Sequence, residues 1–205
     1  MNKKLFDYYK DYVLTHHEKP SSVYAFCKEN KLKESDFYKH YNSFDALENS
    51  VTNSFLKHII ETLHKDDNFT NYNSREKMLA LFYAWTEKAL EERSFFVYLA
   101  KNDSGPTKNG IGALKLQFNE FVKHIIRDAI NANEILERKF ISDKYFHAVW
   151  TQFILIHTYW LKDKSHGFEK TDAFIEKSTR LLFDLLGQTA LDSALDLAKL
   201  MFQKK

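Results

Sequence analysis

The spacing of apolar residues between positions 22 and 47 is the feature that most constrains how this chain of 205 residues can fold. Val23, Phe26 and Cys27 recur at the spacing of one helical face. Asn30 and Lys31 then interrupt that face. A second short apolar face follows, formed by Leu32, Phe37, Tyr38 and Tyr41. Two short helices packed at a steep angle, a helix-turn-helix, are expected from this pattern.

The rest of the chain also favours helices, because residues that break helices are rare in it. It contains only five Gly and two Pro, beside 18 Phe and 11 Tyr. Hydrophobic residues make up 44% of the sequence, which is ample for one core or for two small domains that share one. We therefore predict an all-α protein.

Apolar periodicity places the expected helices along the chain. They cover about residues 3–15, 22–30, 34–41, 43–65, 75–92, 94–101, 113–132, 143–162, 171–186 and 191–202. The stretches 66–74 and 102–112 are predicted to be loops. Ser74 is expected to cap the helix that follows it, without a full capping box, and Gly187 is expected to cap the end of the helix over 171–186.

The segment 26–47 resembles the helix-turn-helix signature of the tetracycline-repressor (TetR) family, I-A-x-x-x-G-V-S-x-x-x-L-Y-x-H-F-x-S-K-x-x-L, when laid on it without a gap. The residues that match in kind are Phe26, Cys27, Leu32, Phe37, Tyr38, His40, Tyr41, Ser43 and Leu47. Lys31 stands for the turn glycine of the signature, Lys33 for its capping serine, and Phe44 for the lysine after the recognition helix. The resemblance is specific over residues 22–47, about an eighth of the chain.

The resemblance implies an architecture and a function. Residues 1–45 would form a three-helix helix-turn-helix domain that binds DNA, joined by the connector helix 43–65 to a C-terminal helical bundle. This bundle, within residues 46–205, would bind a ligand and form a dimer interface. The implied protein is a transcriptional regulator, a repressor, whose homodimer binds a palindromic double-stranded DNA operator. A small apolar ligand would enter the bundle, tilt the connector and release the operator.

Candidate DNA contacts follow from placing the helix over 34–41 in a major groove. Its outward residues would read bases, and lysines around the turn would neutralise phosphates. The candidates are Ser22, Lys28, Lys31, Lys33, Ser35, Asp36, Tyr38, Lys39 and His40. Eight lysines and eight acids within residues 1–50 leave this half formally neutral. A lysine in place of Phe44 is expected to strengthen DNA binding, because a phenyl ring cannot contact phosphate.

Aromatic residues crowd the second half of the sequence, where an effector would bind. The candidates for its site are Trp85, Phe96, Gln117, Phe121, His124, His147 and Trp150, which combine apolar rings with a few polar groups. Ordinary core packing also explains each ring. His147 and His157 lie about 15 Å apart along a helix axis, which is too far for one metal ion.

Apolar stripes on the helices over 143–162 and 171–186 have two explanations. They consist of Ile154, His157, Ile175, Thr179, Leu182, Phe183 and Leu186. In a monomer these residues would be core. The family resemblance instead implies that the final helix pair forms a four-helix interface in a homodimer.

Catalytic, metal and membrane roles find no support in the sequence. No G-x-S-x-G, H-E-x-x-H, P-loop or G-x-G-x-x-G motif occurs, so no catalytic residue and no cofactor is expected. The single cysteine, Cys27, is expected to be a buried inert thiol, and it cannot build a thiolate metal site. No window is long and apolar enough for a membrane span. The N-terminus, MNKKLFDYYK, lacks the apolar core of a signal peptide, so a cytoplasmic protein is expected.

A second hypothesis stays open beside the regulator. A protein with the same fold could have lost DNA binding and instead bind a lipid or a partner protein. The missing lysine at Phe44, the neutral N-terminal half and the abundance of aromatic residues favour it. The charge on the surface around the helix-turn-helix distinguishes the two hypotheses, because lysines that converge on one face favour the regulator.

Overall fold

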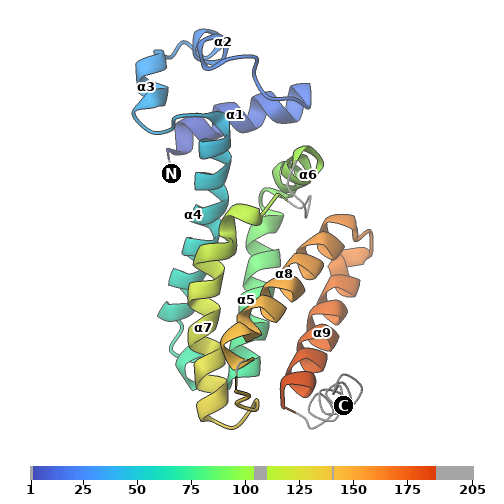
Figure 1. Cartoon of the computed structure of the whole chain (residues 1–205). Helices are drawn as coiled ribbons and strands as arrows, with labels where there is room; N and C mark the ends of the chain where they lie inside the picture. Colours follow the sequence, from blue (N-terminus) through green and yellow to red (C-terminus); the bar gives the residue numbers. More distant parts are fainter. Residues whose placement is uncertain (1, 104–109, 140, 188–205) are drawn as a thin grey trace, which may run out of the picture. The chain divides into compact units, whose positions relative to one another are not determined.

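The computed structural model describes residues 2–103, 110–139 and 141–187, and these form helices joined by short connections (Figure 1). The described residues contain no strand. The prediction of an all-α protein is therefore confirmed. The helix expected over 191–202 lies outside the described residues. Gly187, which was expected to cap the helix before it, is the last described residue of that helix.

Four helices make up the N-terminal part of the chain. They are α1 (Lys3–His16), α2 (Val23–Glu29), α3 (Glu34–Tyr38) and α4 (Phe44–Lys65). Side-chain oxygens cap the first, second and fourth of them: Asn2 accepts from the Leu5 N–H, Ser22 from Ala25 and Ser43 from Ala46. These caps explain why the helices begin where periodicity put them.

Helix α3 is shorter than the predicted span of 34–41. It ends at Tyr38. The His40 N–H bonds the Phe37 carbonyl at 2.9 Å, a bond to the third residue back that tightens the chain into a turn. Tyr41 then packs into the core, where its side chain is buried. Lys39 and His40 consequently lie on the turn after the helix.

Five more α-helices follow in the described residues. They are α5 (Ser74–Leu90), α6 (Arg93–Asn102), α7 (Lys115–Asn131), α8 (Tyr145–Lys162) and α9 (Glu169–Gly187). Short 3-10 turns precede several of them: η1 (Phe69–Asn71), η2 (Gly112–Leu114), η3 (Ser142–Lys144) and η4 (His166–Phe168). The helices expected to start at 113 and 143 therefore start with a 3-10 turn.

The predicted cap at the start of α5 is wrong. Asn73, not Ser74, occupies the cap position, and its side-chain oxygen accepts from the Glu76 N–H at 2.9 Å. The Glu76 carboxylate accepts from the Asn73 N–H, also at 2.9 Å, which completes a reciprocal capping box. Ser74 is the first helical residue, and both its N–H and its hydroxyl donate to the Glu134 carboxylate.

The described chain divides into two compact units. Unit 1 contains the chain up to Glu61 together with Trp85–Gln117, and unit 2 contains Thr62–Ala84 with the chain from Phe118 onward. Helices α4 and α5 each pass from one unit into the other. The predicted boundary at residue 45 between a DNA-binding domain and a ligand-binding bundle stays a prediction. It does not coincide with the boundary between the units, because unit 1 holds α6 as well as the helix-turn-helix.

Aromatic rings fill the core of both units. In unit 1 the buried Phe26 and Phe37 rings meet edge to face at 6.1 Å. In unit 2 Phe118 of α7 stacks on Phe153 of α8 at 4.5 Å, and Trp150 packs 5.3 Å from Phe118. Each such pair contributes about 0.5–1.5 kcal/mol beyond the burial of its area.

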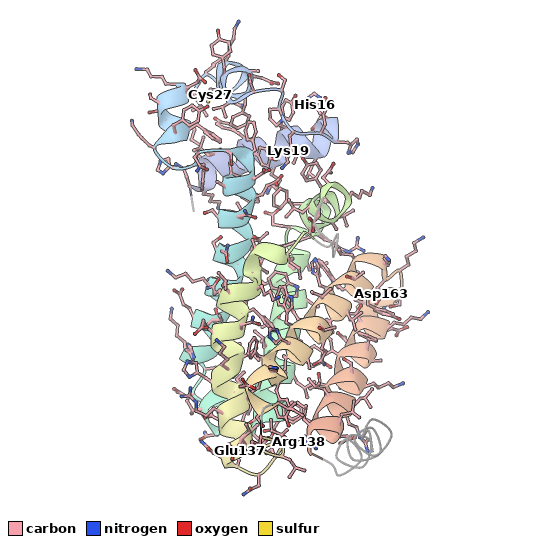
Figure 2. All side chains as sticks on the ribbon, viewed as in Figure 1. His16, Lys19, Cys27, Glu137, Arg138 and Asp163 are labelled. Atoms are coloured by element: carbon pink, nitrogen blue, oxygen red, sulfur yellow. The ribbon has the colours of Figure 1, made fainter. Side chains whose placement is uncertain are left out.

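Helices α8 and α9 run side by side in unit 2 (Figure 1). Asp163, labelled in Figure 2 at the end of α8, holds the turn between them. Its carboxylate accepts hydrogen bonds from the N–H and hydroxyl of Ser165 and of Thr171, at 2.7–2.9 Å. These bonds, with those from Thr171 contributing most, hold the pKa of the Asp163 carboxyl far below its usual range.

Candidate functional site

The surface around α3 carries the polar residues that the sequence marked for contact with a partner. Exposed among them are Ser22, Lys28, Lys31, Lys33, Ser35, Tyr38, Lys39 and His40, and Asp36 is half-buried. All of them belong to unit 1 and lie on α2, on α3 or in the residues directly next to these two helices. Their side chains are thus open to a ligand of the helix-turn-helix.

Two shallow grooves flank the turn between α3 and α4. One has a volume of about 410 Å³ and is lined by Tyr38, Lys39, His40, Tyr41, Asn42, Ala46 and Ser50. The other, of about 370 Å³, shares His40, Tyr41 and Ser50 and adds Asn2. The Asn2 N–H donates to the Tyr41 hydroxyl at 2.9 Å, which fixes the N-terminus of α1 at this place. Polar groups dominate the lining, so the grooves suit a polar or charged backbone.

An ion pair lies on the exposed side of α3. Lys39 Nζ donates to Asp36 Oδ1 at 2.9 Å. This hydrogen bond, and then the charge of Lys39, holds the pKa of the Asp36 carboxyl below its usual range. On α2, the Lys28 ammonium lies 5.9 Å from the centre of the exposed Tyr24 ring. The positive charge of this surface is therefore partly engaged within the chain.

The turn between α2 and α3 has a left-handed backbone. Lys31 adopts φ 55°, the region that glycine enters without a steric penalty. The Leu32 N–H then bonds the Cys27 carbonyl at 2.8 Å and closes the turn. This geometry explains physically why the TetR signature has glycine where this chain has Lys31.

Phe44 is half-buried and packs against other aromatic rings, and the effect of a lysine here on DNA binding stays a prediction. Its ring stacks on Tyr9 at 5.2 Å. It also meets Phe26 and Phe37 edge to face, at 5.5 and 5.4 Å. A lysine at this position would remove a ring from the centre of the helix-turn-helix. Cys27 is buried beside this core, and burial raises the pKa of its thiol, as expected for an inert cysteine.

A polar network that sequence reasoning missed ties the helix-turn-helix to the start of α4. Tyr9 donates its hydroxyl hydrogen to Glu48 Oε1 at 2.6 Å. Lys19, labelled in Figure 2 between α1 and α2, donates to Glu48 Oε2 at 2.9 Å and also to Asp45. Burial first, and then the Glu48 charge, raise the pKa of Tyr9 well above its ordinary value. The Tyr98 hydroxyl of α6 completes the surroundings of Tyr9.

Helix α6 contacts α1 within unit 1. Lys10 of α1 forms an ion pair with Glu92 at 2.8 Å, and Phe6 meets Phe95 edge to face at 5.1 Å. Phe96 on α6 packs 5.4 Å from Phe55 of α4. The helix-turn-helix and the first part of α4 therefore share one core with α6.

The residues expected to bind a ligand are divided between the two units. Trp85 and Phe96 are buried in unit 1, where their rings lie 5.5 Å apart, and Gln117 is half-buried at its end. Unit 2 holds the others. Phe121 packs against His64 and Phe69, and Trp150 against Phe118 and Phe153. His124 and His147 are exposed on the surface.

The stripes expected to form a dimer interface lie mainly between α8 and α9 of one chain. His157, Ile175, Thr179 and Leu186 are buried, and Ile154, Leu182 and Phe183 are half-buried. Gln152 of α8 donates from Nε2 to the hydroxyls of Ser178 and Thr179 on α9, at 3.0 and 2.9 Å. The buried members of the stripe therefore hold the helix pair together.

Other apolar side chains of the pair face outward, and sequence reasoning did not select them. On α8, Leu155 is 54% and Tyr159 39% exposed, and on α9 the values are 59% for Leu181 and 44% for Leu185. Each helix thus carries an exposed apolar pair four residues apart, and we call these four residues the outer face of α8 and α9. The four-residue spacing of each pair, about one helical turn, was the signal in the sequence that could have predicted this face.

Two further properties concern the described part of the chain. None of its helices combines the length and the apolar character that crossing a bilayer requires. Residues 2–103, 110–139 and 141–187 contain no group of three or more His, Cys, Asp or Glu side chains that could hold a metal ion.

Comparison with known proteins gives one match. The family model described as "Tetracyclin repressor-like, C-terminal domain" matches residues 77–201, more than half of the chain. No curated protein and no solved structure matches. The matched region begins in α5 and includes α6 to α9.

Proposed function

The chain belongs to the tetracycline-repressor family, and on this premise we propose that it is a DNA-binding transcriptional regulator, a repressor controlled by a small apolar ligand. Proteins of this family are regulators rather than enzymes. One observation carries the proposal. The helix-turn-helix has a core closed by the Phe26, Phe37 and Phe44 rings, while the polar side chains around α3 stay exposed.

In this proposal α3 enters the major groove of an operator. Ser35, Asp36 and Lys39 contact base edges, and the lysines of the turn, Lys28, Lys31 and Lys33, neutralise phosphates. The grooves beside α3 accept the sugar–phosphate backbone, with Tyr38 and His40 at their edges. Ser22 caps α2 and can donate its hydroxyl hydrogen to a phosphate.

Regulation requires that the ligand bind the DNA-competent and the released states with different affinity. Within unit 2, the rings of Phe121 and Trp150 supply apolar surface for such a ligand. Helix α4 runs from the helix-turn-helix in unit 1 into unit 2. A change in α4 or α6 would act on the helix-turn-helix through the Glu48 network and the Lys10–Glu92 ion pair.

A homodimer would bring two helix-turn-helix units to one palindrome. The outer face of α8 and α9 supports this proposal, because Leu155, Tyr159, Leu181 and Leu185 expose apolar area that an interface would bury. The half-buried Ile154, Leu182 and Phe183 could extend the interface.

The second candidate function is binding of a lipid or protein partner without DNA. The specific observation in its favour is the weak positive charge of the α3 surface, where Lys39 is paired with Asp36 and Phe44 is turned inward. Fewer free cations at the surface mean fewer phosphate contacts and weaker binding of DNA.

Fluorescence anisotropy separates the two candidates. The purified protein is titrated against the intergenic DNA upstream of its own gene and against a scrambled duplex at the same near-physiological salt. A regulator that controls its own gene binds the native duplex at least about a thousandfold more tightly than the scrambled one. Equal weak binding to both, together with failure of a random DNA library to yield a motif, would contradict the proposal and favour the second candidate.

A further inference from the structure

The helix-turn-helix lacks the side chain that reads guanine most often. The first arginine of the sequence is Arg75, which follows α4. Arginine binds guanine O6 and N7 with two parallel hydrogen bonds from a rigid fork, whereas lysine acts as a point charge. Reading of guanine by α3 must therefore use lysine in place of arginine, with neighbouring groups that orient the ammonium.

One pair of side chains on this surface presents an acceptor and a donor next to each other. Asp36 Oδ1 accepts from Lys39 Nζ at 2.9 Å, and the side chains of Asp36 and Lys39 are 46% and 68% exposed. The pKa of the Asp36 carboxyl is lowered by Lys39 first and, more weakly, by the charge of Lys33. Asp36 is therefore an ionised acceptor at neutral pH.

A cytosine·guanine pair carries the complementary pattern on its major-groove edge. Cytosine N4 donates there, and guanine O6 beside it accepts. These two atoms are hydrogen-bonded to each other within the base pair, so about 2.9 Å separates them. The carboxylate and the ammonium of the protein are separated by the same distance, 2.9 Å. The carboxylate can therefore accept from cytosine N4, and the ammonium can donate to guanine O6, while the ion pair stays intact.

Other base pairs fit this pattern less well. An adenine·thymine pair also places an amino donor, N6, beside a carbonyl acceptor, O4. Next to O4, however, thymine has its methyl group, whereas guanine offers N7 as a second acceptor for the ammonium. The intact ion pair also carries no net charge, so the carboxylate approaches the phosphate-lined groove without the repulsion that an unpaired acid meets.

We propose that Asp36 and Lys39 act as one unit that reads a single cytosine·guanine pair in each operator half-site. The proposal rests on the DNA-binding function proposed above and names the base that Asp36, one of the two acidic residues of α3, recognises. Asp36 accepts from cytosine N4, and Lys39 donates to guanine O6 and N7.

Selection from a random DNA library tests this unit. Wild type, Asp36→Ala, Lys39→Met and the double variant are compared, with Asp36→Asn as a fifth protein. The wild-type motif should contain a cytosine·guanine pair that both single variants cease to prefer, each losing roughly 5- to 150-fold in discrimination at that position alone. Asp36→Asn should shift the preference there towards adenine, because an amide bonds adenine N6 and N7.

A matched pair on α7 provides the control. Glu120 and Lys123 have the same spacing, a separation of 2.8 Å and exposed side chains, but they lie outside unit 1. Glu120→Ala and Lys123→Met should leave the selected motif unchanged. The proposal is overturned if the wild-type motif persists in the Asp36 and Lys39 variants, or if the two variants lose preference at different positions. Failure of wild type to select any motif would instead overturn the proposed DNA-binding function, and this inference with it.

Discussion

The hydroxyl of Tyr9 in α1 donates to Glu48 Oε1 in α4 at 2.6 Å, and this bond joins two helices whose residues are 39 positions apart. We expect Tyr9→Phe to lower the free energy of unfolding by about 1.5–3 kcal/mol, because it removes a bond to a charged acceptor and leaves a carboxylate oxygen without that donor. Urea unfolding followed by circular dichroism measures the change. Tyr8→Phe, on the same helix, is the matched control and should cost much less.

The left-handed turn residue gives a prediction of opposite sign. Lys31→Gly should raise the free energy of unfolding by about 0.5–1 kcal/mol, since glycine accepts φ 55° without steric strain. Lys28→Gly, in the last turn of α2, should instead lower it by about 1 kcal/mol. Thermal melts of the two variants and of wild type measure both changes in stability. Equal destabilisation by both would mean that the backbone at Lys31 carries no strain.

Replacing Phe44 by lysine should unfold the helix-turn-helix rather than strengthen DNA binding. The substitution removes a half-buried ring that contacts Tyr9, Phe26 and Phe37, at a cost of about 1.5–3 kcal/mol. Tyr38→Lys, which adds the same charge on the exposed surface of α3, should leave the melting temperature nearly unchanged. A folded Phe44→Lys protein with tighter DNA binding would contradict the inward placement of this side chain.

The turn between α8 and α9 should make stability depend on acid. The pKa of Asp163 is depressed in the folded protein by its hydrogen bonds, first those from Thr171. Its contribution is therefore present above the unfolded pKa of about 4 and is lost as pH falls below that value. Asp172 has a raised pKa, because of burial and then the charges of Glu176 and Asp163, so it opposes this trend.

Asp163→Asn should lower the melting temperature at neutral pH and flatten its decline between neutral pH and about pH 3. Melts of wild type and variant across that range give the comparison. Asp143→Asn, an exposed acid near the start of α8, is the control and should leave the decline as it is in wild type. An unchanged decline in Asp163→Asn would show that other carboxylates govern acid unfolding.

The outer face of α8 and α9 predicts which substitutions separate a dimer. If the proposed dimer forms through this face, Leu181→Glu should yield a folded monomer, because the glutamate would have to be buried without a partner. Sedimentation equilibrium measures the molar mass. Leu116→Glu is the matched control, since Leu116 is 82% exposed on α7 in unit 1 and lies outside this face. A dimer that survives Leu181→Glu and Leu155→Glu together would exclude the outer face as the interface.

Sequence periodicity predicted the helices well because most of them carry one apolar stripe. It located α1, α2 and α4 together with the polar surface around α3, where each exposed residue lies a few positions from a buried ring. The left-handed turn at Lys31 was not predicted, although the signature glycine at this position was a signal for it.

Contacts between distant residues could not be predicted in this way. The Lys19–Glu48 ion pair joins residues 29 positions apart, and no local pattern indicates it. Periodicity also cannot tell whether an apolar stripe faces a neighbouring helix of the same chain or a second copy. Thr179 and Ile175 are buried within one chain, and a dimer interface at these residues stays a prediction. The Asn73 cap was missed because the neighbouring Ser74 is an equally good capping residue.

Helices α1, α4 and α6 share one core, and this limits which parts of the chain can be moved to another protein. A fragment that ends at Glu61 would lack the Phe95 and Phe96 rings on which Phe6 and Phe55 rest. A chimera that grafts this helix-turn-helix onto another bundle at residue 45 would leave the same apolar surface bare. The transplantable module is therefore discontinuous in sequence, and exchange of the helix-turn-helix between relatives would have to carry α6 along with α1 to α4.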